Sequence, residues 1–179
     1  MSEQTIESHF ADLTSAIEMS LSGKKHLPAL ILIYSTLDIL AWLNRPSTHP
    51  DVTKCDFLAW VDQYLRPGPS LHCTPIDLYA ARCGIIHSLQ AESKLSREGK
   101  ARQVWYSWGK CEVARLRASI RQAKLEKTAV PVQVEALFEA LKSGITQFLE
   151  SLEADPSHAK LVYDRARKKF FTDIPHELL

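Results

Sequence analysis

The residues with the clearest chemical potential are an arginine and a histidine five positions apart, Arg82 and His87, in the largely apolar segment 78–89. A neutral imidazole can accept a proton near neutral pH, and a guanidinium binds oxyanions. On one helix the two side chains would lie about 140° apart with Cys83 between them, and the long arginine can bend toward the imidazole. The same spacing also fits a structural role, in which Arg82 is buried against Asp38 and the backbone satisfies His87.

The four cysteines indicate neither a metal site nor a disulfide framework. They are separated by 18, 10 and 28 residues, so none forms the Cys-x-x-Cys spacing of zinc or redox sites. A nucleophilic role for Cys83 would need a base that the sequence does not supply, and the adjacent His72 and Cys73 are interpreted as loop residues. We therefore expect no metal, no cofactor and four reduced thiols, Cys55, Cys73, Cys83 and Cys111.

Helical periodicity runs through most of the chain. Apolar residues recur every three or four positions in the first twenty residues and, most strongly, after Val134. Thr53 and Thr74 are typical helix caps, and Pro75 suits the first position of a helix because an N–H there would be unpaired. The pattern predicts helices over residues 2–21, 27–43, 54–65, 75–90, 134–153 and 156–169, with Phe170, Phe171 and Ile174 folding back onto the core.

The segment from about 94 to 132 is predicted to be a small α/β insertion. Its first half contains a run of β-branched and aromatic residues that favours a strand, and a polar helix over 110–125 follows. Residues 129–132 would supply the second strand of a hairpin-like unit.

Length and composition are those of an ordinary globular protein. The 179 residues, 45% hydrophobic and 24% charged, fit a single domain spanning residues 1–179. The longest apolar run, 27–43, contains Asp38 and is short for a membrane span, so it predicts a core helix. The N-terminus has no secretory pattern. We therefore expect a mainly α-helical cytoplasmic protein with no membrane association.

The pair Arg82 and His87 forms an Arg-x4-His pattern on a late helix, and an apolar helix bearing Asp38 precedes it. This combination resembles the HEPN family, and the likeness covers about residues 2–90 and 134–153. The resemblance implies a HEPN-like up-and-down helical bundle, interrupted by the insertion at about 94–132 and followed by a C-terminal helix at 156–169.

The resemblance also implies a function. Family members typically form homodimers in which two arginines and two histidines meet in one cleft, and active members cut RNA without a metal. His87 would be the base for a ribose 2′-hydroxyl, Arg82 the phosphate clamp, and Asp38 and Cys83 supporting residues. The expected function is that of a dimeric RNA-binding or RNA-cleaving protein of the toxin or defence kind, with a cognate antitoxin as a further partner. The alternative is a non-catalytic helical interaction or nucleotide-binding protein.

The insertion is also the basic part of the chain. Residues 94–127 contain ten Lys or Arg and three Glu, a net charge of +7 in a chain whose total is +1. Basic residues interleaved with aromatic ones suit a nucleic-acid backbone and its bases, although a solvated helix face beside a dimer interface fits the same pattern. The predicted RNA-binding residues are Arg102, Lys110, Arg115, Arg117, Arg121, Trp105 and Tyr106.

Overall fold

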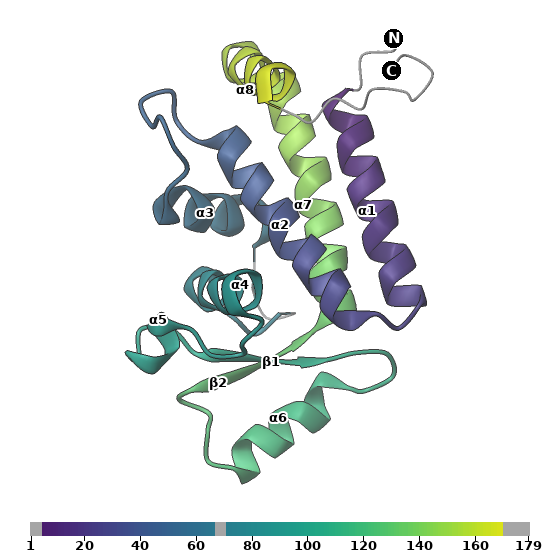
Figure 1. The fold of residues 1–179 in the computed structure, drawn as a ribbon, viewed down its shortest axis with the longest axis vertical. Helices are drawn as coiled ribbons and strands as arrows, with labels where there is room; N and C mark the ends of the chain where they lie inside the picture. The colour runs from purple at the N-terminus through teal and green to yellow at the C-terminus, as the bar shows by residue number, and fades with distance from the viewer. Residues whose placement is uncertain (1–4, 67–70, 170–179) are drawn as a thin grey trace.

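A computed structural model describes residues 5–66 and 71–169 of the chain, and this part is mainly α-helical, as the sequence predicts. Three long helices, α1 (Ile6–Ser22), α2 (His26–Asn44) and α7 (Val134–Ala154), pack against one another (Figure 1). The last helix, α8 (Pro156–Lys169), packs on α2 and α7 at one end of this bundle. The predicted fold-back of Phe170, Phe171 and Ile174 lies outside the described residues.

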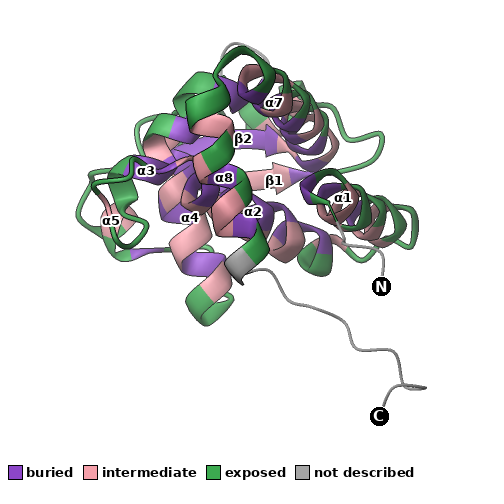
Figure 2. Cartoon of the chain, turned by 90° about the horizontal axis from the view of Figure 1, so that it is seen from above, coloured by how far each residue is buried: buried purple, intermediate pink, exposed green. Residues whose placement is uncertain are grey.

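The core forms where α2 and α7 meet their neighbours. The apolar stripe predicted after Val134 is buried along one side of α7. Helix α2 is buried on a wider arc because α1, α3, α4 and α7 all contact it, and Figure 2 shows the buried residues gathered between the helices and the exposed ones on their outer sides. Within the described residues, α2 alone is long and apolar enough to cross a membrane, but half of it is buried inside the protein, as expected of a core helix.

Short local signals set the boundaries of the next two helices. Helix α3 (Lys54–Trp60) starts at a reciprocal capping box between Thr53 and Asp56, and a π-helical turn, Val61–Leu65, continues it. Helix α4 (Pro75–Ser88) starts at an equivalent box between Thr74 and Asp77 with proline at its first turn, as predicted. These caps satisfy backbone N–H groups that a helix start would otherwise leave unpaired.

The insertion contains two strands and a helix, but the expected hairpin is wrong. Strand β1 (Gln103–Ser107) pairs with β2 (Ala129–Gln133) in parallel, from the pair Gln103–Ala129 to the pair Ser107–Gln133. A hairpin requires antiparallel strands and a short turn, whereas helix α6 (Val113–Gln122) carries the chain back across the sheet between them. A short helix, α5 (Lys94–Arg97), precedes β1.

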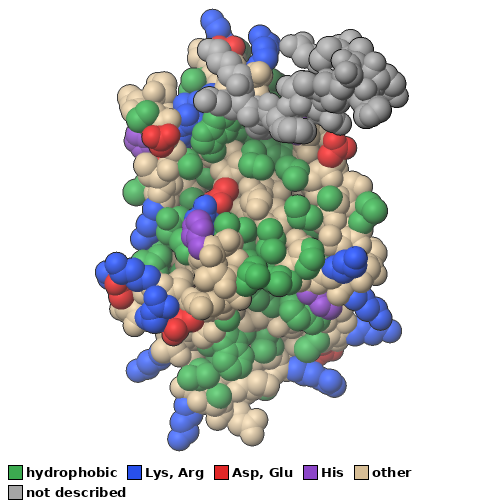
Figure 3. Space-filling view, in the orientation of Figure 1, with side chains coloured by type: hydrophobic (Ala, Val, Ile, Leu, Met, Phe, Trp, Pro, Cys, Tyr) green, Lys and Arg blue, Asp and Glu red, His purple; other side chains and the backbone are tan. Residues whose placement is uncertain are grey.

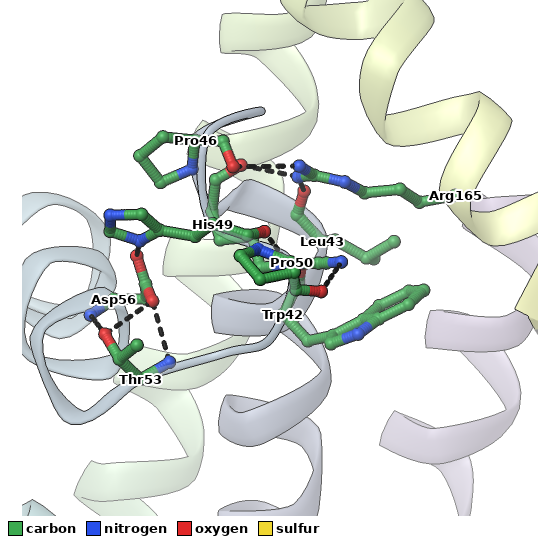
Figure 4. Close-up of polar contacts among 9 residues, drawn as sticks. Trp42, Leu43, Pro46, His49, Pro50, Thr53, Asp56 and Arg165 are labelled. Carbon is green, nitrogen blue, oxygen red and sulfur yellow. Dashed lines mark hydrogen bonds and ion pairs between the residues drawn. The ribbon is translucent and has the colours of Figure 1, made fainter.

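Two arginines close the C-terminal end of α2 (Figure 4). Arg45 donates to the carbonyls of Trp42, His49 and Pro50, at 2.5–3.0 Å. Arg165 of α8 donates to the carbonyls of Leu43, Arg45 and Pro46 at 2.5–3.1 Å. The last carbonyls of a helix lack partners within it and attract cations, so this arrangement ties both the following loop and α8 to α2.

Candidate functional site

The sequence-predicted pair lies on α4, and α2 supplies a third residue. Arg82 meets the Asp38 carboxylate side-on, with Nε 3.0 and 2.7 Å from its two oxygens and Nη2 2.6 Å from Oδ2. Both side chains are partly exposed, at 20% and 29%. Partial burial alone would lower the pKa of Arg82, but the Asp38 carboxylate outweighs it and raises the pKa, so the guanidinium remains charged.

The same guanidinium also contacts the histidine. Arg82 Nη1 lies 3.0 Å from His87 Nε2, so the arginine spans the angular gap that their five-residue spacing creates on the helix. A guanidinium can only donate, so Nε2 must accept, and the ring is then neutral with its proton on Nδ1. His87 is solvent-exposed, and the ring nitrogen that could take a proton is the one that faces Arg82.

Cys83 and Tyr79 border this cluster. The Cys83 sulfur lies 4.0 Å from Arg82 Nη1 and interacts with the Tyr79 hydroxyl. Burial, together with the neighbouring Cys83, raises the pKa of Tyr79, so the hydroxyl stays protonated. The Tyr79 hydroxyl therefore borders the arginine as an uncharged group.

The chain beyond His87 turns back and packs closely against Gly84 of α4. Leu89 adopts a left-handed conformation with φ of 54°, and the Gln90 N–H bonds to the Gly84 carbonyl at 3.1 Å. A Cβ on Gly84 would lie 2.4 Å from the Gln90 carbonyl oxygen, closer than real contacts allow. Gly84 was not singled out from the sequence, because only the folded path of residues 89–92 shows why a side chain is excluded there.

Hydrophobic side chains surround the Asp38–Arg82–His87 cluster. One face of α2 is only partly covered, because the residues on it, spaced every three or four positions, are not fully buried: Leu27, Ile31, Ser35, Asp38 and Trp42. Figure 3 shows hydrophobic side chains spread over this face around a small charged group. The apolar frame, as we call it, consists of the partly or fully exposed hydrophobic residues that share these faces of α2 and α4 with the cluster, together with Leu89 at the end of α4, which is 63% exposed: Leu27, Ile31, Trp42, Tyr79, Ile86 and Leu89.

The predicted RNA-binding residues have different environments. Arg102 is held by the buried carboxylate of Asp77, through Nη2 at 2.6 Å and Nε at 3.2 Å. The Tyr106 hydroxyl bonds to that of buried Tyr34 at 2.5 Å, and burial raises the pKa of Tyr106. Trp105 is half-buried in β1.

The other predicted RNA-binding residues are exposed. Lys110 precedes α6, and Arg115, Arg117 and Arg121 lie on it. Within the described residues no ion pair engages these four cations. Burial of the His72 ring lowers the pKa of that histidine, and the charge of Arg117 lowers it further. A basic surface on α6 is therefore present, and its RNA binding stays a prediction.

Among residues 5–66 and 71–169, no group of three His, Cys, Asp or Glu side chains is arranged to hold a metal ion. No family model matches the chain, and neither does any curated protein or solved structure. The function must therefore be argued from the geometry of the site itself.

Proposed function

We propose that this chain is a HEPN-like homodimer that binds and cleaves RNA without a metal, as a protein of the toxin or defence kind. The observation that carries the proposal is the contact between Arg82 and His87, 3.0 Å apart on an exposed face, with Asp38 fixing the arginine from the other side. His87, a proton acceptor, and Arg82, an oxyanion-binding group, thus lie close enough to contact the same phosphodiester.

The reaction follows from these two groups. His87 Nε2 takes the proton of a ribose 2′-hydroxyl, which must first replace Arg82 as the partner of that nitrogen. The O2′–phosphorus bond forms, the phosphorus–O5′ bond breaks, and the products are a 2′,3′-cyclic phosphate and a 5′-hydroxyl. Arg82 binds the non-bridging oxygens, whose charge grows in the transition state. The leaving O5′ needs a proton, and the second copy's His87 would supply it from its protonated, imidazolium form, which becomes neutral as the first copy's His87 becomes protonated.

The apolar frame supports the dimer. Hydrophobic residues that surround a polar cluster on an open face are typical of an interface with another protein. A two-fold dimer uses the same patch on both chains, so pairing through this face would bring two copies of Arg82 and His87 together. A cognate antitoxin is the further partner that the toxin proposal includes.

The decisive experiment is incubation of purified protein with mixed RNA in excess EDTA. We expect cleavage products that end in a 2′,3′-cyclic phosphate. His87→Ala should abolish cleavage and change the unfolding free energy by less than about 1 kcal/mol, because the ring is exposed. Arg82→Lys should also be inactive, because an ammonium cannot reproduce the side-on contact with Asp38 while it also binds a phosphate. Light scattering should give twice the chain mass of 20.2 kDa.

A second candidate, a non-catalytic interaction protein, is favoured by one specific observation. The side-on edge of Arg82, which would clamp a phosphate, is already occupied by Asp38. In that case the cluster only positions the two chains of a dimer. Wild-type protein that is inert toward RNA, together with an Arg82→Lys variant that dissociates into monomers, would favour this candidate over the ribonuclease.

A further inference from the structure

Two segments distant in sequence meet at an exposed ring stack. His26 is the first residue of α2, and Trp108 directly follows β1. Their rings lie parallel, with centroids 4.1 Å apart and planes tilted by 4°. Trp108 keeps 37% of its surface exposed, so the histidine covers only part of the indole.

Both segments are fixed by hydrogen bonds to their backbone groups. After Trp108, the Gly109 N–H donates to Glu135 Oε1 at 2.7 Å, and Gln133 Nε2 donates to the Gly109 carbonyl at 3.1 Å. Before His26, the N–H of Lys25 bonds to the Ser20 carbonyl at 2.8 Å and closes the end of α1. The backbone on both sides of the stack is therefore fixed, and the parallel contact with His26 orients the indole before any ligand arrives, which lowers the entropic cost of binding to it.

Three exposed lysines lie within two residues of the stacked rings along the chain. Lys24 and Lys25 directly precede His26, and Lys110 is two residues beyond Trp108. The nearest acidic side chain along the chain is Glu112, exposed, at the start of α6, and the Glu135 carboxylate accepts the Gly109 N–H. Three lysines against these two glutamates leave a net positive charge, and α6, the next helix along the chain, carries exposed arginines.

We propose that Trp108, backed by His26, is a stacking platform for one base of a single-stranded nucleic acid, and that Lys24, Lys25 and Lys110 bind the adjoining phosphates. Flat aromatic rings among cations are the usual means of holding unpaired bases, which expose their faces, whereas the bases of a duplex are stacked inside. The inference rests on the proposed function for RNA as the ligand, and it places base contact on Trp108 and not on Tyr106, whose hydroxyl is buried against Tyr34.

The test measures binding separately from cleavage. The probe is a fluorescent eight-nucleotide oligouridylate with 2′-O-methyl groups, which has no 2′-hydroxyl to attack the phosphate. Trp108→Leu should weaken its binding about 5- to 150-fold, the usual effect of removing one base–aromatic stack, and Trp108→Phe should keep most of the affinity. Tyr163→Leu is the matched control, since Tyr163 on α8 is also 37% exposed and should have no effect.

The lysines are tested through salt dependence. Lys24→Glu with Lys25→Glu should weaken binding and reduce the slope of log affinity against log salt by about 1.4, or roughly 0.7 for each phosphate that is no longer neutralised. Lys160→Glu, an exposed lysine on α8, should leave the slope unchanged. Blunt-ended duplex RNA should bind wild type and Trp108→Leu equally.

Unchanged affinity for the oligonucleotide in folded Trp108→Leu overturns the platform. If that variant does not fold, the lysine pair decides, and an unchanged salt slope overturns the proposal. The two proposals can fail separately. Wild type that binds the probe through Trp108 but never cuts RNA refutes only the ribonuclease, whereas cleavage with an unchanged KM in Trp108→Leu refutes only the platform.

Discussion

The anchor between Asp77 and Arg102 joins the insertion to α4, and removing it should have a measurable cost. The Asp77 side chain is only 2% exposed. Its oxygens accept bonds from the backbone N–H of Thr74 and Arg102, at 2.9 and 2.7 Å, and from the Arg102 guanidinium at 2.6 and 3.2 Å. Arg102→Ala leaves the two backbone bonds intact and removes the counter-charge.

The expected loss of unfolding free energy is about 2–3 kcal/mol. Breaking a fully buried ion pair costs about 3–5 kcal/mol, but here the arginine is 32% exposed and two donors remain, so the effect approaches that of removing charged hydrogen bonds. For a chain of this size, that corresponds to a fall in Tm of roughly 4–12 °C. Urea denaturation followed by circular dichroism measures the change directly. Lys100→Ala, which removes the exposed pair between Lys100 and Glu98, is the control and should show no change.

The pH dependence provides an independent check. Burial alone would raise the pKa of Asp77, but the hydrogen bonds from Arg102 and Thr74 outweigh it and hold the pKa below its usual value. The stability contributed by a carboxylate with a lowered pKa is present above the unfolded value of about 3.9 and is lost as the pH falls through the folded value. The gap between wild type and Arg102→Ala should therefore be constant near neutrality and close in acid. A gap below about 0.5 kcal/mol at pH 7, or one that persists unchanged at low pH, would refute this reasoning.

Three further outcomes are expected. Gly84→Ala should destabilise the protein by about 1–3 kcal/mol in urea, because its Cβ would meet the Gln90 carbonyl, and wild-type stability would show that the turn adjusts freely. Arg165→Ala should increase hydrogen exchange in α8, because the hydrogen bonds to three carbonyls are removed, and unchanged protection there would contradict this role. Reversing the charge of the three exposed arginines of α6 should weaken RNA binding and reduce its salt slope by about 2. The substitutions are Arg115→Glu, Arg117→Glu and Arg121→Glu, and an unchanged slope would leave these arginines as a solvated face.

Much of the helical framework could be predicted because its signals are local. Thr74, Pro75 and Asp77 specify the start of α4 through one capping box, and the apolar repeat after Val134 specifies the buried side of α7. The two strands of the insertion were also predicted from residue type. Their direction was not, because a run of β-formers carries no information about which way its partner runs, and only the crossing by α6 fixes a parallel pair.

The candidate site was predictable in its residues but not in its bonds. The spacing of Arg82 and His87 left open both a catalytic and a structural pair, since five residues on a helix separate two side chains rather than joining them. The contact between Arg82 and His87 forms because Asp38, 44 residues earlier in the chain, holds the guanidinium within reach of the imidazole. That geometry depends on how α2 packs against α4, which no local pattern encodes.

The sequence by itself determined the helices, their caps, the mainly α class and the excess of positive charge between residues 94 and 127, because each depends on neighbours within a few positions. Tertiary structure alone decided which of those charges and rings are available. Packing directs Arg102 onto Asp77 and buries the Tyr106 hydroxyl, while it leaves Trp108 exposed against His26. Side chains of the same type in one segment thus differ in role because burial and hydrogen-bond partners come from distant parts of the chain.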